Sequence, residues 1–390
     1  MSSFDSKTFN PQAFGAYSET VPKKRLNLMI KANIFKRNKD IADVLKTQTG
    51  SFYAVIPMYG RIGGEPDNYD GKTDINSSSM PTYSRGVVAF GRAKGFTEKD
   101  FSYDITSGVD FMSQVAAQVQ EYWDNANEDT LISIIKGVFA MTSKGGLEFI
   151  NKHTFDITSK EDGKVTETTL NDALQQSSGD KKNVFSLTIM NSSIATSLEN
   201  KKLLKYLTYT TPEGLEMPLN IGFWNGKLVL VDDSITTEVI EATYAKSTDS
   251  SVQPGKTYYT LADGVYTEVA EPTGNPSESD YYEKTADEKT QYVTYAFGEG
   301  AFDYEPLDVK VPYEMDRDPA KNGGEDTLYS RERIVYAPHG ISFTNKNVAS
   351  FSPTNAEFED GANWDIVSDA DGTEYFDHKE IPIVRIISLG

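Results

Sequence analysis

The sequence predicts an α+β fold, and three stretches of the 390-residue chain support that prediction. Residues 107–141 repeat apolar side chains at helical spacing, which is typical of one long helix. Residues 51–106 form two extended segments around a polar connection containing Gly and Pro, which predicts a long β-hairpin. Residues 183–233 combine a buried strand, a helix and an Asn-Gly turn between apolar runs. Helices and strands are therefore expected in one mixed core.

The long helix is expected to begin at Ser107, a good N-cap, with Asp110 returning a hydrogen bond as in a capping box. At 1.5 Å per residue, one unbroken helix would be roughly 50 Å long. Residues 126–129 could let it bend or break, and Lys144-Gly145-Gly146 is expected to stop it. Its second half is apolar nearly all round and should be buried more completely than its first. One apolar stripe marks the first half: Met112, Val115, Ala116, Val119, Tyr122, Trp123 and Ala126.

Composition excludes several classes of site. The chain has no cysteine, which excludes disulfides, thiolate metal sites and a cysteine nucleophile. A formal net charge of −20 argues against a nonspecific DNA-binding surface over most of the chain, because such binding needs Lys and Arg. The charge is uneven. Residues 1–50 carry nine Lys or Arg against four Asp or Glu, and residues 246–290 carry four against nine.

Targeting signals are missing from the sequence pattern. No apolar run approaches the ~18 residues of a membrane span, and the first residues lack the pattern of a secretion signal. We therefore expect no membrane association, and use of the protein in the cytoplasm.

Two N-terminal regions have little core of their own. Residues 1–50 scatter Phe and Tyr among polar residues and read as an arm, with a short helix near Asp40–Lys46. Such an arm could track nucleic acid, but the pattern favours docking on a neighbouring subunit. The hairpin of residues 51–106 is marginal alone, so it should lie on another copy rather than serve as an ordinary surface hairpin.

The middle of the chain predicts the mixed core. The expected elements are a helix over 169–178, a strand over 183–190, a helix over 192–207 capped at Ser192 or Ser193, and a hairpin turning at Asn225-Gly226. Further on, residues 317–326 form a polar, Gly-rich loop between strand-like pieces, and Ile381–Ile387 closes the chain as an apolar strand.

Residues 246–290 interrupt this core as a small inserted β module, with Asp263-Gly264 as a turn. The flanking segments 242–246 and 291–302 are expected to be strands of the host domain. The paired tyrosines of the module could form a carbohydrate or receptor platform, but aromatic residues in short strands more often form a core of their own.

No catalytic pattern is present. The three histidines, His153, His339 and His378, are isolated in the sequence and are expected to be structural or solvated. Asp369-Ala370-Asp371-Gly372 lacks the later ligands of a calcium loop and predicts a turn. The sequence therefore predicts no enzyme, no cofactor, and no catalytic, cofactor-binding or metal-ligating residue. The C-terminal carboxylates are expected to be a solvated face: Glu357, Glu359, Asp360 and Asp365.

Several strings in order along the chain resemble the major capsid protein of tailed bacteriophages, which has the Hong Kong 97-type fold also found in encapsulins and herpesvirus capsid floors. YDGKTDI (69–75) with SRGVVAFGRAKGFTEKDF (84–101) is similar to the extended loop of that family, and residues 107–139 are similar to its spine helix. SPTNAEFEDGANWDIV (352–367) and IPIVRIISLG (381–390) resemble closing segments in phages of Gram-positive hosts. The resemblance covers nearly everything except residues 246–290.

The resemblance implies an organisation into an arm, an extended loop and two main domains. In order, it implies an N-terminal arm (1–50), an extended loop (51–106), a peripheral domain with the spine helix (107–183), an axial domain (184–330) containing the inserted module (246–290), and C-terminal strands returning to the core (331–390). Hexamers and pentamers of the chain would self-assemble into an icosahedral virion capsid, in the host cytoplasm, around double-stranded DNA bound without sequence specificity.

The resemblance also bears on partners. Some relatives carry a scaffolding segment ahead of the arm. Here the chain starts at Met1 with only a short tail, so a separate scaffolding protein is expected, together with a portal; the resemblance leaves a decoration protein open. Some relatives crosslink a loop Lys to a neighbour's Asn. Lys72 lies in that region, but no partner motif is present and no crosslink is assigned.

Three other functions compete with a capsid protein. An encapsulin-like compartment would have the same fold but hold cargo protein, and the long loop and the insertion favour a virus. A surface adhesin or carbohydrate-binding protein would work through residues 246–290, but the missing secretion signal counts against it. A hydrolase would need carboxylates and a histidine clustered in a deep pocket.

Overall fold

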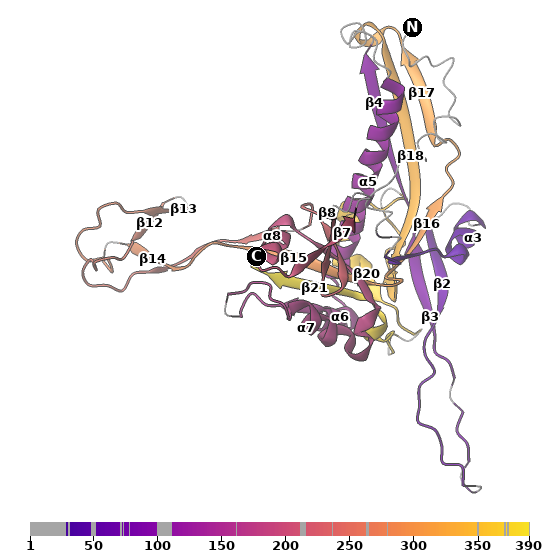
Figure 1. The fold of residues 1–390 in the computed structure, drawn as a ribbon, viewed down its shortest axis with the longest axis horizontal. Helices are drawn as coiled ribbons and strands as arrows, with labels where there is room; N and C mark the ends of the chain where they lie inside the picture. Colours follow the sequence, from indigo (N-terminus) through magenta and orange to yellow (C-terminus); the bar gives the residue numbers. More distant parts are fainter. Residues whose placement is uncertain are drawn as a thin grey trace.

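The computed structural model describes residues 29, 32–47, 52–70, 72, 74–77, 79–99, 111–160, 162–210, 216–235, 237–262, 265–278, 280–348, 351–369, 372 and 374–389. Most of the expected arm, the expected helix start at Ser107 and Asp110, and the expected Asp263-Gly264 turn lie outside these residues. Figure 1 shows a central body from which three parts extend: a tall sheet with its helix, a long open loop, and a thin ribbon ending in a small sheet.

The body is built on an eight-stranded sheet of order β5-β21-β15-β6-β9-β8-β7, with β10 also paired to β15. Helices α6 (Lys144–His153), α7 (Thr169–Ser178) and α8 (Ser192–Asn200) pack near it, and the 3₁₀ turn η1 (Gly179–Val184) leads into β6. Its strands are β5 (Thr154–Asp156), β6 (Phe185–Met190), β7 (Leu204–Thr210), β8 (Glu216–Trp224), β9 (Lys227–Val231), β10 (Thr237–Ile240), β15 (Lys289–Gly298) and β21 (Ile383–Ser388).

A second, five-stranded sheet forms the tall part of Figure 1 around the 14-residue strand β18 (Glu325–Pro338). On one side β18 pairs with β16 (Phe302–Leu307) and β17 (Tyr313–Asp318), on the other with β4 (Phe90–Lys99), and β1 (Phe35–Lys36) pairs with β16. Residues 302–318 and 325–330 were expected in the axial group 184–330. Residues 302–307 and 313–318 pair with β18 in this sheet, and residues 325–330 are the first part of β18 itself.

The predicted long helix is confirmed as α5 (Phe111–Val138), which is continuous through residues 126–129. Along the tall sheet, the Trp123 indole N–H donates to Ser330 Oγ at 2.9 Å. The second half is buried almost throughout, as expected, since its apolar side chains enter the main core. Gly137 lets the helix approach its neighbours closely, because a Cβ there would stand 1.9 Å from the Phe358 carbonyl oxygen.

The predicted stop at Lys144-Gly145-Gly146 is wrong. These residues are the first turn of α6, and Ser143 caps that helix by accepting a hydrogen bond from the Gly146 N–H at 3.0 Å. The two glycines allow close packing rather than ending a helix. A Cβ at Gly145 would meet the Tyr375 ring at 2.5 Å, and one at Gly146 would meet Met141 at 2.5 Å.

The predicted hairpin is shorter than expected. Strands β2 (Tyr53–Tyr59) and β3 (Thr82–Val88) pair in antiparallel register from Tyr53↔Val88 to Tyr59↔Thr82. The rest of the expected second arm is β4, which leaves the hairpin after Ala89 and pairs with β18 over ten residues. Strand β4 therefore belongs to the tall sheet, because it pairs with the longer strand β18 rather than with β2. The expected short helix is confirmed as α3 (Lys39–Thr47).

Around α8 the prediction is partly right. The helix begins at Ser192, but Asn191 is its cap, and the Asn191 side chain accepts from the Ser193 N–H at 2.9 Å. It ends at Asn200 rather than 207, because Leu204 begins strand β7, which pairs with β8. The Asn225-Gly226 turn is confirmed, with positive φ angles of 48° and 77° at its two residues.

The inserted module is a separate four-stranded sheet of order β11-β14-β12-β13. Its strands are β11 (Thr243–Lys246), β12 (Tyr259–Ala262), β13 (Val265–Glu268) and β14 (Tyr281–Ala286). Residues 242–246 were expected to continue the host sheet, but β11 pairs with β14 inside the module. We therefore define the inserted module as residues 243–286. Figure 1 shows it at the end of the ribbon formed by β10 and β15.

The C-terminal part closes the body. Helix α9 (Asn355–Glu359) starts with a capping box of Thr354 and Glu357, and β19 (Ile341–Phe343) pairs with β20 (Trp364–Ile366). Short 3₁₀ turns lie at η2 (Lys321–Gly323), η3 (Gly361–Asn363) and η4 (His378–Glu380). The expected closing strand is confirmed as β21. In the described part of the chain, no helix is both long and apolar enough to cross a membrane.

Candidate functional site

The connection between β2 and β3, residues 60–81, leaves the body as an open loop that we call the loop tip (Figure 1). Its large apolar side chains face solvent: Ile62 is 64% exposed, Tyr69 90% and Ile75 76%. The Asp67 carboxylate joins the two limbs by accepting from the Asn76 backbone N–H at 2.5 Å and its side-chain amide at 3.1 Å. Apolar side chains held this far from any core indicate a contact surface for another molecule.

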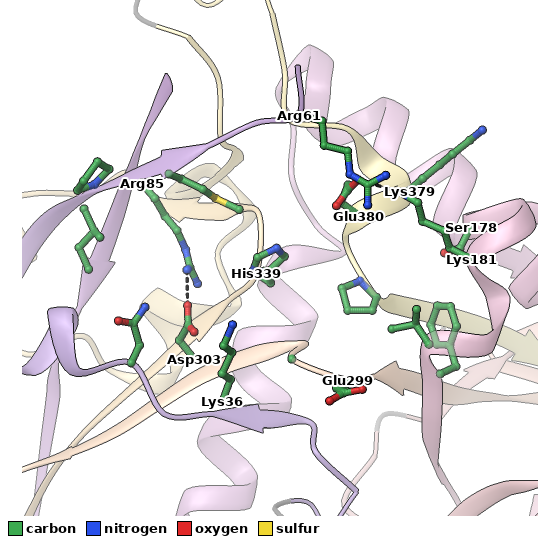
Figure 2. A pocket seen from close by; sticks show the side chains of 18 residues that line it. Lys36, Arg61, Arg85, Ser178, Lys181, Glu299, Asp303, His339, Lys379 and Glu380 are labelled. Atoms are coloured by element: carbon green, nitrogen blue, oxygen red, sulfur yellow. Dashed lines mark hydrogen bonds and ion pairs between the residues drawn. The ribbon is translucent and has the colours of Figure 1, made fainter. Parts of the chain in front are cut away.

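Arg85 on β3 attaches the hairpin to the body. Figure 2 shows its guanidinium facing Asp303 of β16, where Nη1 lies 2.5 Å from the carboxylate, and both side chains are buried. The same guanidinium donates to the carbonyl oxygens of Ala337 and Pro338 at 2.7 Å each and to Ile341 at 3.2 Å. A buried cation needs such complete pairing, so this one side chain joins β3 to three other segments.

Glu380 makes a second attachment at the outer end of the hairpin. Its carboxylate lies 2.7 Å from the Arg61 guanidinium and 2.6 Å from the Lys181 ammonium. Arg61 follows β2 directly, whereas Lys181 belongs to η1 and Glu380 to η4. The first limb of the loop tip is thereby linked to η1 and η4, two elements of the body that lie far apart in the sequence. The three side chains of this attachment are more exposed than Arg85 and Asp303.

A cavity of about 430 Å³ lies between these two attachments, and we call it the cleft (Figure 2). Five cationic and three acidic side chains line it, in a protein of net charge −20. Its apolar part comes from both the hairpin and the body. The lining comprises Lys36, Asn38, Ile56, Pro57, Met58, Arg61, Arg85, Ser178, Lys181, Val184, Phe185, Glu299, Gly300, Asp303, His339, Lys379, Glu380 and Pro382.

Two of the histidines that are isolated in the sequence meet in the structure. His153 Nδ1 lies 2.7 Å from the Ile383 carbonyl oxygen and its Nε2 lies 3.2 Å from His378 Nδ1. Because a carbonyl can only accept, His153 carries its proton on Nδ1 and accepts from His378 through Nε2. Burial lowers the pKa of His153 to about 4, and its ring stacks on Phe149. Its role is structural, as expected.

His339 lies in the cleft near Arg85 and Asp303. Burial lowers its pKa, and the charge of Arg85 lowers it further. A neutral ring beside the buried ion pair fits a structural role, and Figure 2 shows the His339 side chain between Arg85 and Glu380.

Of the carboxylates expected to form a solvated face, Glu359 and Asp360 are exposed and Glu357 and Asp365 are half-buried, and each also has a local partner. Glu357 completes the capping box of α9, Asp360 accepts from the Ala362 N–H at 3.0 Å, and Asp365 accepts from Ser143 Oγ at 2.5 Å. Glu359 pairs with Lys136 at 3.3 Å. Charge at this end of α5 therefore stabilises helix termini and contacts between elements.

The expected calcium-like loop is a turn in the residues described there. The Asp369 carboxylate accepts from the Glu374 N–H at 3.1 Å, and its carbonyl accepts from the Gly372 N–H. Across the described ranges, no cluster of three or more His, Asp or Glu could hold a metal ion.

The tyrosines of the inserted module pack on one another. Tyr244 stacks on Tyr266 with ring centroids 4.0 Å apart, and Tyr259 and Tyr282 contact these rings edge-on. Tyr258 is fully buried, and its hydroxyl donates to the Asp249 carboxylate at 2.8 Å. The rings thus form the small core that the sequence favoured, and the stacked rings turn their flat faces toward each other.

The sequence did not single out Arg85 or Glu380. A signal for Arg85 did exist. In a strand, residues two apart share a face, so Arg85 lies on the inward side with Tyr83 and Val87, where a charged side chain requires a partner. No such signal marks Glu380, because its partners come from 199 and 319 positions away in the chain.

Comparison with known proteins gives one informative relative. No family model matches the chain. A curated relative, the major capsid protein of Bacillus phage SPP1, is 22% identical over 377 residues, covering 97% of this chain and 94% of its own length. The relation therefore runs through the long helix, both sheets and the hairpin, and it gives no support to an encapsulin-like compartment or an adhesin.

Several solved structures are also similar in outline. The capsid of Ralstonia phage GP4 has a TM-score of 0.49 at 10% identity, covering 92% of this chain and 87% of that one. The capsid asymmetric unit of cyanophage Pam1 has a TM-score of 0.44 at 9% identity, covering 92% and 90%. These TM-scores lie below 0.5, so no conclusion rests on them.

The end-to-end relation to the curated protein is what decides the family. It extends over nearly all of both chains, and the structure adds the continuous long helix, the paired hairpin and the mixed core that the sequence resemblance implied. Copies of this chain assemble into a capsid shell. The chain is a major capsid protein of the tailed-bacteriophage type, an α+β structural protein of the virion capsid.

Proposed function

We propose that the chain builds its icosahedral shell from hexamers and pentamers in which the loop tip of each copy lies on a neighbour. The observation that supports this best is the loop tip itself. Residues 60–81 leave the body without a core, and Ile62, Tyr69 and Ile75 expose most of their surface. A second copy would cover that apolar surface, and each copy would in turn cover another.

The two sheets support a division of the chain into two domains in the shell. We propose that α5 with the five-stranded sheet forms the peripheral domain, and that the eight-stranded sheet with α7 and α8 forms the axial domain. Residues 1–50 would be the arm. The inserted module would project from the axial domain on the ribbon of β10 and β15 (Figure 1).

We propose further that the shell encloses double-stranded DNA without sequence-specific binding. The net charge of −20 supports this, because a container lined with cations would bind phosphates tightly and hinder packing and release. A separate scaffolding protein and a portal are proposed partners, and a decoration protein a possible addition. We propose no enzymatic activity, cofactor or metal, and no crosslink at Lys72. Assembly would take place in the host cytoplasm.

Expression of the full chain, alone and with a candidate scaffolding protein, tests this proposal. Light scattering and negative-stain electron microscopy are expected to show closed shells or rings of hexamer size. A monodisperse monomer under every condition would count against the proposed assembly. A variant that lacks the loop tip should form fewer shells. If this variant forms shells with unchanged yield, that result would count against the proposed role of the loop.

A further inference from the structure

We propose that the cleft receives the loop tip of a second copy, with Tyr69 as the apolar anchor and the acidic residues around it paired with the lysines of the cleft. This inference rests on the proposed function and names the surface that the loop tip would contact. Every copy carries both a loop tip and a cleft, so the contact is heterologous and can close into a ring.

The charges of the two surfaces are complementary. Residues 62–77 of the loop tip contain Glu65, Asp67, Asp70 and Asp74 against one cation, Lys72. Five cations and three acids line the cleft. Of these, Arg85 is paired with Asp303, and Arg61 and Lys181 share Glu380.

Charge remains uncompensated on both surfaces. Within the described residues, Lys36, Lys379 and Glu299 on the cleft and Glu65 and Asp74 on the loop tip have no ion pair, and all five are exposed. The unpaired groups on the cleft are therefore two cations against one acid, whereas those on the loop tip are acids. Figure 2 shows the Lys36 side chain reaching toward Asp303 and His339. A carboxylate entering here would meet a cation held by the body.

Apolar surface is complementary as well. Tyr69 is 90% exposed at the loop tip, and the cleft presents Ile56, Met58 and Phe185 among its lining residues. Tyrosine is a frequent anchor in protein interfaces, because it buries a large ring and keeps a hydroxyl for hydrogen bonding. The cavity of about 430 Å³ leaves room for such a side chain.

The inserted module is a weaker candidate for the same cleft. It is also acidic, but three of its acids are paired internally: Asp280 with Lys246 at 2.6 Å, and Asp249 and Glu283 with Lys256 at 2.8 and 3.0 Å. Its aromatic rings are already packed on each other. The exposed acids Glu65 and Asp74 of the loop tip have no such ion pair within the described residues, so the loop tip gains more from docking.

A charge exchange between two variants tests the contact. The cleft variant carries Lys36→Glu and Lys379→Glu, and the loop variant carries Glu65→Lys and Asp74→Lys. Each alone brings like charges together and is expected to lose at least about tenfold in shell yield under conditions where the wild type assembles. A third variant that carries all four substitutions restores opposite charges at every contact, in hexamers and pentamers alike, and its shells are expected to reappear.

Matched controls separate this effect from net charge. Lys164→Glu with Lys205→Glu changes the charge of exposed residues outside the cleft by the same amount, and this variant is expected to assemble like the wild type. If the wild type forms shells and the cleft and loop variants form them equally well, the inference is overturned and the proposed function still stands. Failure of the four-substitution variant to assemble would overturn the inference too, provided that it melts like the wild type.

Disulfide trapping gives a second measurement that does not depend on altered charge. The chain has no cysteine, so Met58→Cys with Tyr69→Cys introduces one thiol in the cleft and one in the loop tip. Oxidation of assembled shells with added diamide, which accepts the two electrons, is expected to give a ladder of linked copies on a non-reducing gel. Leu147→Cys with Tyr69→Cys is the control, since Leu147 is exposed on α6. A ladder from the control pair alone would overturn the inference.

Discussion

The loop tip and the inserted module both extend from the body, but they are stabilised in different ways. The module has a buried Tyr258, stacked rings and its own ion pairs. In the loop tip, the side chains of Asp67 and Asn76 link the two limbs, and the segment depends on the body through Arg85 and Glu380 at its base. A segment that carries its own core can vary independently of the shell, whereas one that lacks a core relies on its base and on a neighbour.

The largest expected effect comes from the buried ion pair. Arg85→Met leaves the Asp303 carboxylate buried without its cation, and we expect a loss of about 3–5 kcal/mol in the free energy of unfolding. Urea denaturation of soluble protein measures it. Limited proteolysis should also show faster cleavage at Arg61 and Lys72, with cleavage in the module unchanged. Arg85→Lys keeps the charge and should lose less. Equal cleavage in both regions would contradict the comparison.

The next effect concerns pH. The folded-state pKa of His153 is about 4, below its ordinary 6.5, because burial disfavours the charged ring. This contribution to stability is fully present above pH 6.5 and is lost as the pH falls from 6.5 through 4, about 3 kcal/mol in all. Besides His378, the charged groups that influence the pair are Asp377, Glu148, Lys152 and Lys379.

The expected consequence is local as well as global. His378 and Glu380 belong to the same short turn, η4, so acidification should release the loop base before it affects the module. Melting temperatures measured between pH 7 and pH 4 should fall more steeply for the wild type than for His153→Gln, which has no group to titrate. Parallel melting curves for the two proteins would show that the histidine pair does not control this response.

A smaller effect is expected at the exposed attachment. Glu380→Gln removes the ion pairs with Arg61 and Lys181, but these groups are partly solvated, so the loss should be about 0.5–1 kcal/mol. Added salt should reduce the difference between variant and wild type. A loss as large as that of Arg85→Met would mean that Glu380, rather than Arg85, determines how the hairpin is held.

The smallest effect should follow removal of the module. Ile240 and Lys289 face each other across the ribbon, so replacing residues 241–288 with Asn-Gly would close it with a two-residue turn. Stability of the body is expected to change by no more than about 0.5 kcal/mol, and shells should still form. Thermal melting and electron microscopy check this. Loss of folding would show that the module and the body share a core after all.

Much of the fold could be predicted from local patterns. The spacing of Val119 and Trp123 with the buried run after Asp129 indicated the long helix, and Asn225-Gly226 indicated a turn that the φ angles bear out. Errors occurred where tertiary contacts decide. Gly145 and Gly146 resembled a helix stop because glycine ends helices locally, but Tyr375 and Met141 require glycine there for packing.

The candidate site was less predictable than the fold. The apolar residues of the loop tip were visible in the sequence, and so was the excess of acids around Tyr69. The cleft was not, because its lining comes from the hairpin, from β1, from η1 and from η4. Pairing of β4 with β18 rather than with the hairpin was equally hidden, since a strand pattern does not name its partner.

The sequence by itself determined the order of elements, the absence of cysteine chemistry and the presence of a segment without a core. These follow from local periodicity and composition, which each stretch carries on its own. Only the tertiary structure decided which strands pair, that His153 meets His378, and that Arg85 joins β3 to Asp303. Those contacts link residues more than 200 positions apart, and their energies arise only when burial brings the groups together.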